Sequence, residues 1–162
     1  EARALRALSE ALDGLPRRRG PDGDLQAVVD LARELTRAHY AALAVTDRHD
    51  RTQGFFVSGL DPAILSALKG PPQGHGPLGS LREDGRPVRY ENVEQARKAF
   101  GFPPRHPTMK KLLGIALWVG TDVRGSIYVT DRDDGEQFDD DDERTLVTLG
   151  HHASTVIEHR WF

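Results

Sequence analysis

Histidines are the side chains of this chain best suited to bind a metal, and their spacing decides which of them could act together. The chain has seven. His151 and His152 are adjacent, which places them about 100° apart on a helix, so they cannot both bind one ion as residues four apart can. We expect solvent exposure or a dimer contact for this pair. Four others lie in turns or near helix ends with no evident partner: His39, His49, His75 and His159.

An acidic run of five residues, 139 to 143, has the composition of a cation site but not its spacing. A calcium loop needs oxygen ligands at intervals and a glycine at its turn, and the run has neither. Negative charge is favourable at the N-terminus of a helix. We therefore expect Asp140 and Glu143, three residues apart, to form a capping box at the start of a final helix.

Several kinds of chemistry are disfavoured by composition. The chain has no cysteine, which excludes disulfides, cysteine-bound zinc, thiol catalysis and thioether-linked chromophores. The glycines of residues 70–79 (GPPQGHGPLG) do not lead from a strand into a helix, and no Gly-Lys-Ser/Thr follows, so nucleotide phosphate binding has little support. No nucleophile with a base or metal cluster can be placed. We expect a domain that is not an enzyme.

Length and charge narrow the class further. The chain has 162 residues, which favours one domain, and its net charge of -3 with scattered basic residues argues against nucleic acid. No apolar run approaches the roughly 20 residues of a membrane span, so we expect no membrane contact. The absence of disulfides agrees with a cytoplasmic protein. We expect this segment to be part of a longer protein whose output machinery lies elsewhere.

Leucines mark the first element. Their spacing of three, four and three residues predicts a helix over 1–15 that needs a partner, for signalling or dimerisation: Leu5, Leu8, Leu12 and Leu15. Glycines and prolines indicate a linker over 16–23. The compact domain, 24–162, is expected to begin with a helix capped by Asp24, whose apolar face carries Leu25, Val28, Val29, Ala32 and Leu35.

Strand patterns follow that helix. Residues 40–46 and 53–58 predict a hairpin, a short helix is expected from Asp61 to Lys69, and 87–90 predicts an edge strand. Residues 112–119 and 124–130 predict a central strand pair. A final helix carries a buried stripe made of Leu146, Val147, Leu149, Ala153, Val156 and Ile157. Such an order favours an α+β fold, an antiparallel sheet with the terminal helices on one face and the long irregular middle covering a ligand pocket on the other.

Alternation along the last strand assigns its residues to the two faces of the sheet. Ser126, Tyr128 and Thr130 share one face, and Ile127 and Val129 share the other. The aliphatic pair is expected to meet the helices. Tyr128 then faces the expected pocket.

The stretches FGFPPRHPTMKKLLGIALWVGTDVRGSIYVTDR and FDDDDERTLVTLGHHASTVIEH carry a family resemblance. They contain a His-Pro-x-Met segment at 106–109, a Leu-Gly-Ile strand at 113–115 and a Gly-x-x-Tyr-x-Thr-Asp strand at 125–131. From about Asp24 to Phe162 the chain resembles the GAF domains of mycobacterial DosS/DosT (DevS-type) sensor histidine kinases and related actinobacterial kinases. The resemblance implies a GAF fold with a central antiparallel sheet of five or six strands.

The resemblance also implies a ligand. In DosS/DosT members the pocket between sheet and loops holds haem b, which senses oxygen, nitric oxide, carbon monoxide or iron redox state. Their proximal iron ligand matches His106, and their distal tyrosine matches Tyr128. Met109 and Trp118 are further cofactor-binding positions by this likeness. Neutral imidazole is a common haem ligand, and a tyrosine can donate one hydrogen bond in a distal pocket.

Other positions depart from the haem-binding pattern. Thr108 and Ala116 replace prolines, and Trp118 stands where an arginine is usual; the ring of Trp118 could fill the cavity instead of lining it. His106 could also be a loop histidine bonded to backbone, and Tyr128 a buried tyrosine whose hydroxyl reaches a loop carbonyl. These departures motivate the alternative of a cofactor-free GAF module that dimerises or binds another small organic ligand.

Taken together, the residues and the resemblance predict a sensory GAF domain of a cytoplasmic two-component histidine kinase. Its expected partners are a gas or other small-molecule ligand, a second copy of the chain and a kinase output domain. Haem b, bound through His106, is the expected cofactor.

Overall fold

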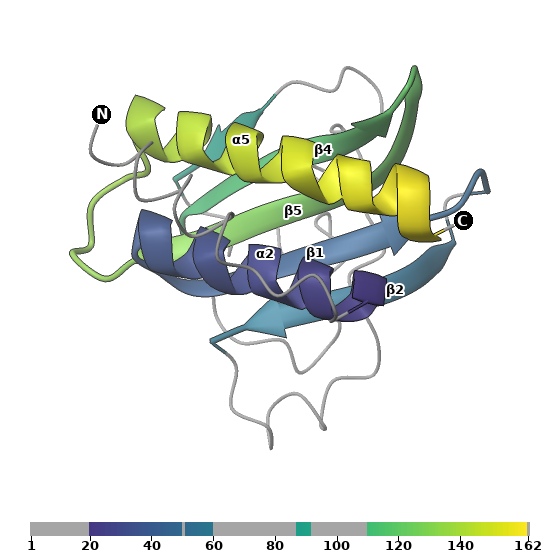
Figure 1. Ribbon diagram of the computed structural model, residues 1–162. Helices are drawn as coiled ribbons and strands as arrows, with labels where there is room; N and C mark the ends of the chain where they lie inside the picture. The colour runs from purple at the N-terminus through teal and green to yellow at the C-terminus, as the bar shows by residue number, and fades with distance from the viewer. Residues whose placement is uncertain (1–19, 50, 60–86, 92–109, 162) are drawn as a thin grey trace.

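Five strands form one open sheet in the computed structural model, which describes residues 20–49, 51–59, 87–91 and 110–161 (Figure 1). The strands are β1 (Ala38–Thr46), β2 (Thr52–Ser58), β3 (Val88–Tyr90), β4 (Leu112–Val119) and β5 (Asp122–Arg132). They lie in the order β2-β1-β5-β4-β3, and every neighbouring pair is antiparallel. The expected α+β class is confirmed, with β4 and β5 inside the sheet and the short β3 at its edge.

Two long helices, α2 (Gly20–Thr36) and α5 (Asp140–Val156), lie side by side across one face of the sheet (Figure 1). We call this the inner face, and the opposite side the outer face. The predicted apolar stripes of both helices pack against the inner face, where Leu25, Leu146 and Leu149 are completely excluded from solvent and Leu35 and Val147 are partly buried. A helix whose apolar residues fall on one side gains most of its stability from such packing. Neither helix is long and apolar enough to span a bilayer.

The N-terminus of α5 is capped one residue earlier than predicted. The side chain of Asp139 accepts a hydrogen bond from the backbone N–H of Asp142, and the side chain of Asp142 accepts one from the backbone N–H of Asp139. The prediction that Asp140 and Glu143 form the capping box is wrong because both carboxylates instead pair with Arg89 of β3, at 2.6 Å and 3.3 Å.

The start of α2 also differs from the prediction. The helix begins at Gly20, inside the expected linker, and Asp24 is a buried residue of the helix and not its cap. Pro21 does not prevent this start, because the first turn of a helix has no use for the missing N–H. Asp24 instead forms an ion pair with Arg160.

The last turn of the chain is held against the sheet by its aromatic side chain. After α5 the helix widens into a π-helical turn, η2 (Ile157–Trp161). Trp161 packs edge-on against Phe56 of β2, with ring centroids 6.0 Å apart, and a Cβ atom at Gly54 would lie 2.7 Å from its indole ring. Glycine within a strand often marks such a close approach.

Several predictions fall outside the described residues. These are the helix over 1–15, residues 16–19 of the linker, the short helix from Asp61 to Lys69, the irregular segments expected to cover the outer face, His106 and Met109. They stay predictions.

Candidate ligand site on the outer face of the sheet

Tyr128 lies on the outer face, as strand alternation predicted. Its neighbours Ile127 and Val129 belong to the core between the sheet and the helices, whereas Tyr128 belongs to a second, separate cluster. Its side chain is only 3% exposed. Burial raises the pKa of the Tyr128 phenol above its ordinary value of 10, so the hydroxyl stays neutral and is chemically able to donate a hydrogen bond.

The register of the sheet surrounds Tyr128 with small residues. Ala42 of β1 lies opposite it on one side, and Gly114 of β4 on the other. The next row along the same face is Ala44, Ser126 and Ala116. Directly opposed side chains normally pack against each other across a sheet, and here nothing larger than a methyl group flanks the phenol. The centre of the outer face is therefore a low floor.

Larger side chains frame this floor. Leu112 is fully buried, and aromatic and aliphatic residues of four strands pack against the same cluster: Tyr40, Phe55, Val57, Val88, Tyr90 and Val123. Ligand sites in proteins are commonly apolar surfaces with a few polar groups that fix orientation. The outer face has this composition.

Thr130 adds a second polar group to the face. It lies two residues beyond Tyr128 on β5, between Tyr40 and Leu112, and is completely buried. Its hydroxyl has no hydrogen-bond partner among the described residues. The alternation along β5 placed Thr130 on this face, but nothing in the sequence alone showed that its hydroxyl would be without a partner.

Trp118 is not brought together with Tyr128. The β4–β5 register shifts between Leu117 and Trp118, where β4 no longer continues the regular alternation. Trp118 is 39% exposed and lines a groove of about 440 Å³ between β4 and α5, together with His151 and Glu158. It therefore does not fill the centre of the outer face, which removes one reason to expect a blocked cavity.

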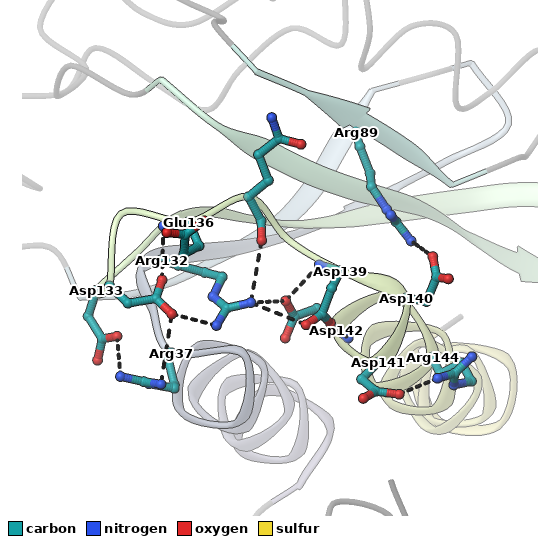
Figure 2. A network of polar contacts seen from close by, with 12 residues as sticks. Arg37, Arg89, Arg132, Asp133, Glu136, Asp139, Asp140, Asp141, Asp142 and Arg144 are labelled. Carbon is teal, nitrogen blue, oxygen red and sulfur yellow. Dashed lines mark hydrogen bonds and ion pairs between the residues drawn. The ribbon is translucent and has the colours of Figure 1, made fainter.

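The acidic run at the start of α5 is part of an ion network that holds β5 to the helix (Figure 2). The guanidinium of Arg132 lies 2.6 Å from Asp134, 3.3 Å from Asp139 and 3.2 Å from Asp142. The backbone N–H of Asp142 and then Arg132 hold the pKa of Asp139 below its usual value, while burial raises the pKa of Asp142. These carboxylates have arginine and backbone partners. Within the described ranges, no group of three or more metal-binding side chains comes together.

A family model for the GAF domain matches residues 20–158. The chain belongs to the GAF domain family. Solved GAF structures agree with the fold: the GAF domain of a phosphoenolpyruvate-protein phosphotransferase from Acinetobacter is 19% identical, with a TM-score of 0.76 over 98% of this chain and 92% of that one. The match carries the fold alone.

Two more structures show what proteins of this fold do elsewhere. A domain of a putative two-component sensor histidine kinase from Sinorhizobium meliloti 1021 has a TM-score of 0.60 at 17% identity, over 84% of this chain and 89% of that one. JSC1_58120g3, solved with bound biliverdin IXa, has a TM-score of 0.67 at 9% identity, over 98% and 99%. The GAF domain is a sensory and signalling module, and JSC1_58120g3 is one protein of this fold that holds a tetrapyrrole.

Proposed function

We propose that this GAF domain is the sensory input of a cytoplasmic histidine kinase of the DosS/DosT type and that it binds haem b on the outer face of its sheet. The observation that carries the proposal is the position of Tyr128 between Ala42 and Gly114, beside the small row Ala44, Ser126 and Ala116. A flat macrocycle needs a surface of this kind, on which the residues directly opposite Tyr128 carry no large side chain.

The residues fit the group in their chemistry. Tyr128 is a neutral hydrogen-bond donor in an apolar cluster, and Thr130 offers a second buried hydroxyl. When bound, haem supplies an iron that binds diatomic gases and changes redox state. Tyr128 would orient and stabilise a polar ligand by donating a hydrogen bond from its hydroxyl, while the apolar frame would exclude water from the site. His106 is the proposed iron ligand and Met109 a further contact, both by resemblance.

Signal output is proposed to run through the helices on the inner face. A ligand changes a protein's conformation only if it binds two states unequally, and β5 belongs to both the outer cluster and the helix-side core. We propose a homodimer through the terminal helices, joined to a kinase output domain in the parent chain. Sedimentation of the purified domain tests the dimer; a monomer at all concentrations would contradict it.

The test of haem binding is an absorption spectrum of the domain expressed with haem supplied. Wild type should show a Soret band, and His106→Ala should lose or shift it. His151→Ala is the matched control, since His151 is exposed on α5, the helix that covers the opposite face of the sheet (Figure 1). A wild-type protein with no Soret band ends the proposal.

A second function is favoured by one specific observation. Tyr128, Ala42 and Leu112 are almost completely buried by the protein itself, as expected of a cofactor-free module used for dimerisation or for a smaller organic molecule. A wild-type protein that shows no Soret band but is dimeric would favour this second function.

A further inference from the structure

Thr130 carries a buried hydroxyl that no described residue of the domain bonds. The residue is fully excluded from solvent, and its Oγ1 has no hydrogen-bond partner in the described part of the chain. Most buried polar side chains are hydrogen-bonded, because leaving one unpaired forfeits the bonds it made with water. A valine has nearly the same shape and would avoid that penalty.

Other threonines show how the fold normally satisfies such a group. Thr36 is 1% exposed and donates to the carbonyl of Ala32 at 2.6 Å, and Thr148 and Thr155 bond the carbonyl four residues before them. A strand offers no carbonyl at that position, so a threonine on β5 depends on a partner from outside its own strand. Thr130 has Tyr40 and Leu112 on its two sides.

The position of Thr130 indicates what that partner is. It lies on the face of Tyr128, about 7 Å further along β5, at the end of the sheet where β4 begins. Lys110 is exposed and lies two residues before β4 at this end, so a carboxylate here would lie near a cationic side chain, whereas Nζ of Lys111 donates to the carbonyl of Gly135. At the edge of a haem b, the hydrogen-bonding groups are its two propionates.

We propose that the Thr130 hydroxyl donates a hydrogen bond to a propionate of the bound haem and so fixes the orientation of the macrocycle on the outer face. This inference rests on the proposed function. Hydrogen bonds from a hydroxyl to a carboxylate are stronger than those between neutral groups, so the contact should contribute measurably to affinity.

The experiment compares Thr130→Val and Thr130→Ser with wild type by two measurements, the melting temperature of the haem-free domain and the affinity for hemin. Thr130→Val should melt at the same temperature as wild type or about 2–4 °C higher, because no bond is lost in the haem-free state. It should bind hemin about tenfold more weakly. Thr130→Ser keeps the hydroxyl and should bind within about threefold of wild type.

Thr46→Val is the matched control. Thr46 is also buried, at 2% exposure, with an unpartnered hydroxyl, but it lies about 20 Å along β1 from Tyr40. It should leave hemin affinity unchanged. Hemin dimethyl ester identifies the group contacted: wild type should prefer hemin over the ester, and Thr130→Val should lose most of that preference.

The outcomes separate this inference from the proposed function. A wild type that binds hemin while Thr130→Val binds it equally well overturns the inference alone. A melting temperature of haem-free Thr130→Val several degrees below wild type also overturns it, because the hydroxyl then has a structural partner. A wild type that binds no hemin overturns both.

Discussion

The inner and outer faces of the sheet are formed by the same strands but by different kinds of side chain. On the inner face, Leu43, Ile127 and Ile115 lie opposite one another on β1, β5 and β4, and each is at most 5% exposed. On the outer face, the corresponding central positions are Ala42, Tyr128 and Gly114. A one-residue step along each strand thus exchanges a row of large aliphatic groups for two small residues around a phenol.

The two faces are therefore expected to serve different purposes: the inner face stabilises the domain and the outer face binds a ligand. Close-packed aliphatic groups contribute most of the free energy of folding, and they leave no space for a ligand. Small residues beside a few hydroxyl groups contribute less to folding and offer polar contacts. Substitutions on the inner face should therefore change stability, and substitutions on the outer face should change binding.

The largest expected effect is on the inner face. Leu43→Ala removes a fully buried side chain of β1, and should lower the free energy of unfolding by about 2–5 kcal/mol because a cavity remains beneath the helices. Urea unfolding followed by circular dichroism measures this. A loss below about 1 kcal/mol would contradict the assignment of the stabilising core to this face.

Filling the floor of the outer face should have the next largest effect. Ser126→Leu introduces a large side chain between Ala44 and Ala116, and should weaken hemin binding at least tenfold, which is about 1.4 kcal/mol. Ser126 is only partly buried, so the melting temperature should change little. Titration of the haem-free domain with hemin measures the affinity; an unchanged value would place the ligand elsewhere.

Removing the N-terminal cap of α5, which packs on the inner face, should have a smaller effect on the free energy of unfolding, and this effect should depend on pH. Asp139→Ala should cost about 1 kcal/mol at neutral pH. The backbone N–H of Asp142 lowers the pKa of Asp139 in the folded state, so this stabilisation is present above the unfolded pKa of 3.8 and is lost as the pH falls through the lower folded value. The gap in unfolding free energy between wild type and variant should narrow below that pH.

Asp139→Asn serves as the control for this variant. Asparagine keeps an oxygen that accepts from the backbone but cannot titrate, so its stability should depend less on pH in the acidic range. A wild-type advantage over Asp139→Ala that stays constant into strong acid would show that the charge contributes nothing.

The smallest expected effect concerns Trp118. Trp118→Phe should change stability by less than about 0.5 kcal/mol and leave hemin affinity unaltered, because the side chain is 39% exposed in a groove beside α5. Calorimetric melting and hemin titration check the two parts. Weaker hemin binding would instead support Trp118 as a cofactor contact.

Much of the fold was predictable because it follows from local patterns. Alternation placed Ile127 and Val129 under the helices and Tyr128 opposite them, and the apolar stripes of α2 and α5 were identified from their spacing. The starts of both helices were not, because Asp24, Asp140 and Glu143 have partners distant in sequence, in Arg160 and Arg89. The sequence around an acidic residue near the start of a helix is the same whether its carboxylate caps the helix or pairs with a distant arginine.

The candidate site was predictable only in part. Tyr128 came from strand alternation and a family resemblance. Its neighbours Ala42 and Gly114 depend on the pairing register of three strands, which the sequence of one strand does not contain. Trp118 was expected to be a cofactor contact, but an irregularity in the β4–β5 register separates it from Tyr128.

The contact between Trp161 and Gly54 has a mechanical consequence. The indole lies where any side chain at residue 54 would stand, and the adjacent Arg160 is tied to Asp24 of α2. Edge strand β2, helix α2 and the turn η2 are therefore attached at one corner of the domain, so η2 can rotate only if β2 moves or the indole loses its contact with Gly54. A torque applied to residue 161 from outside the domain would therefore displace the edge strand β2 before the other strands of the sheet.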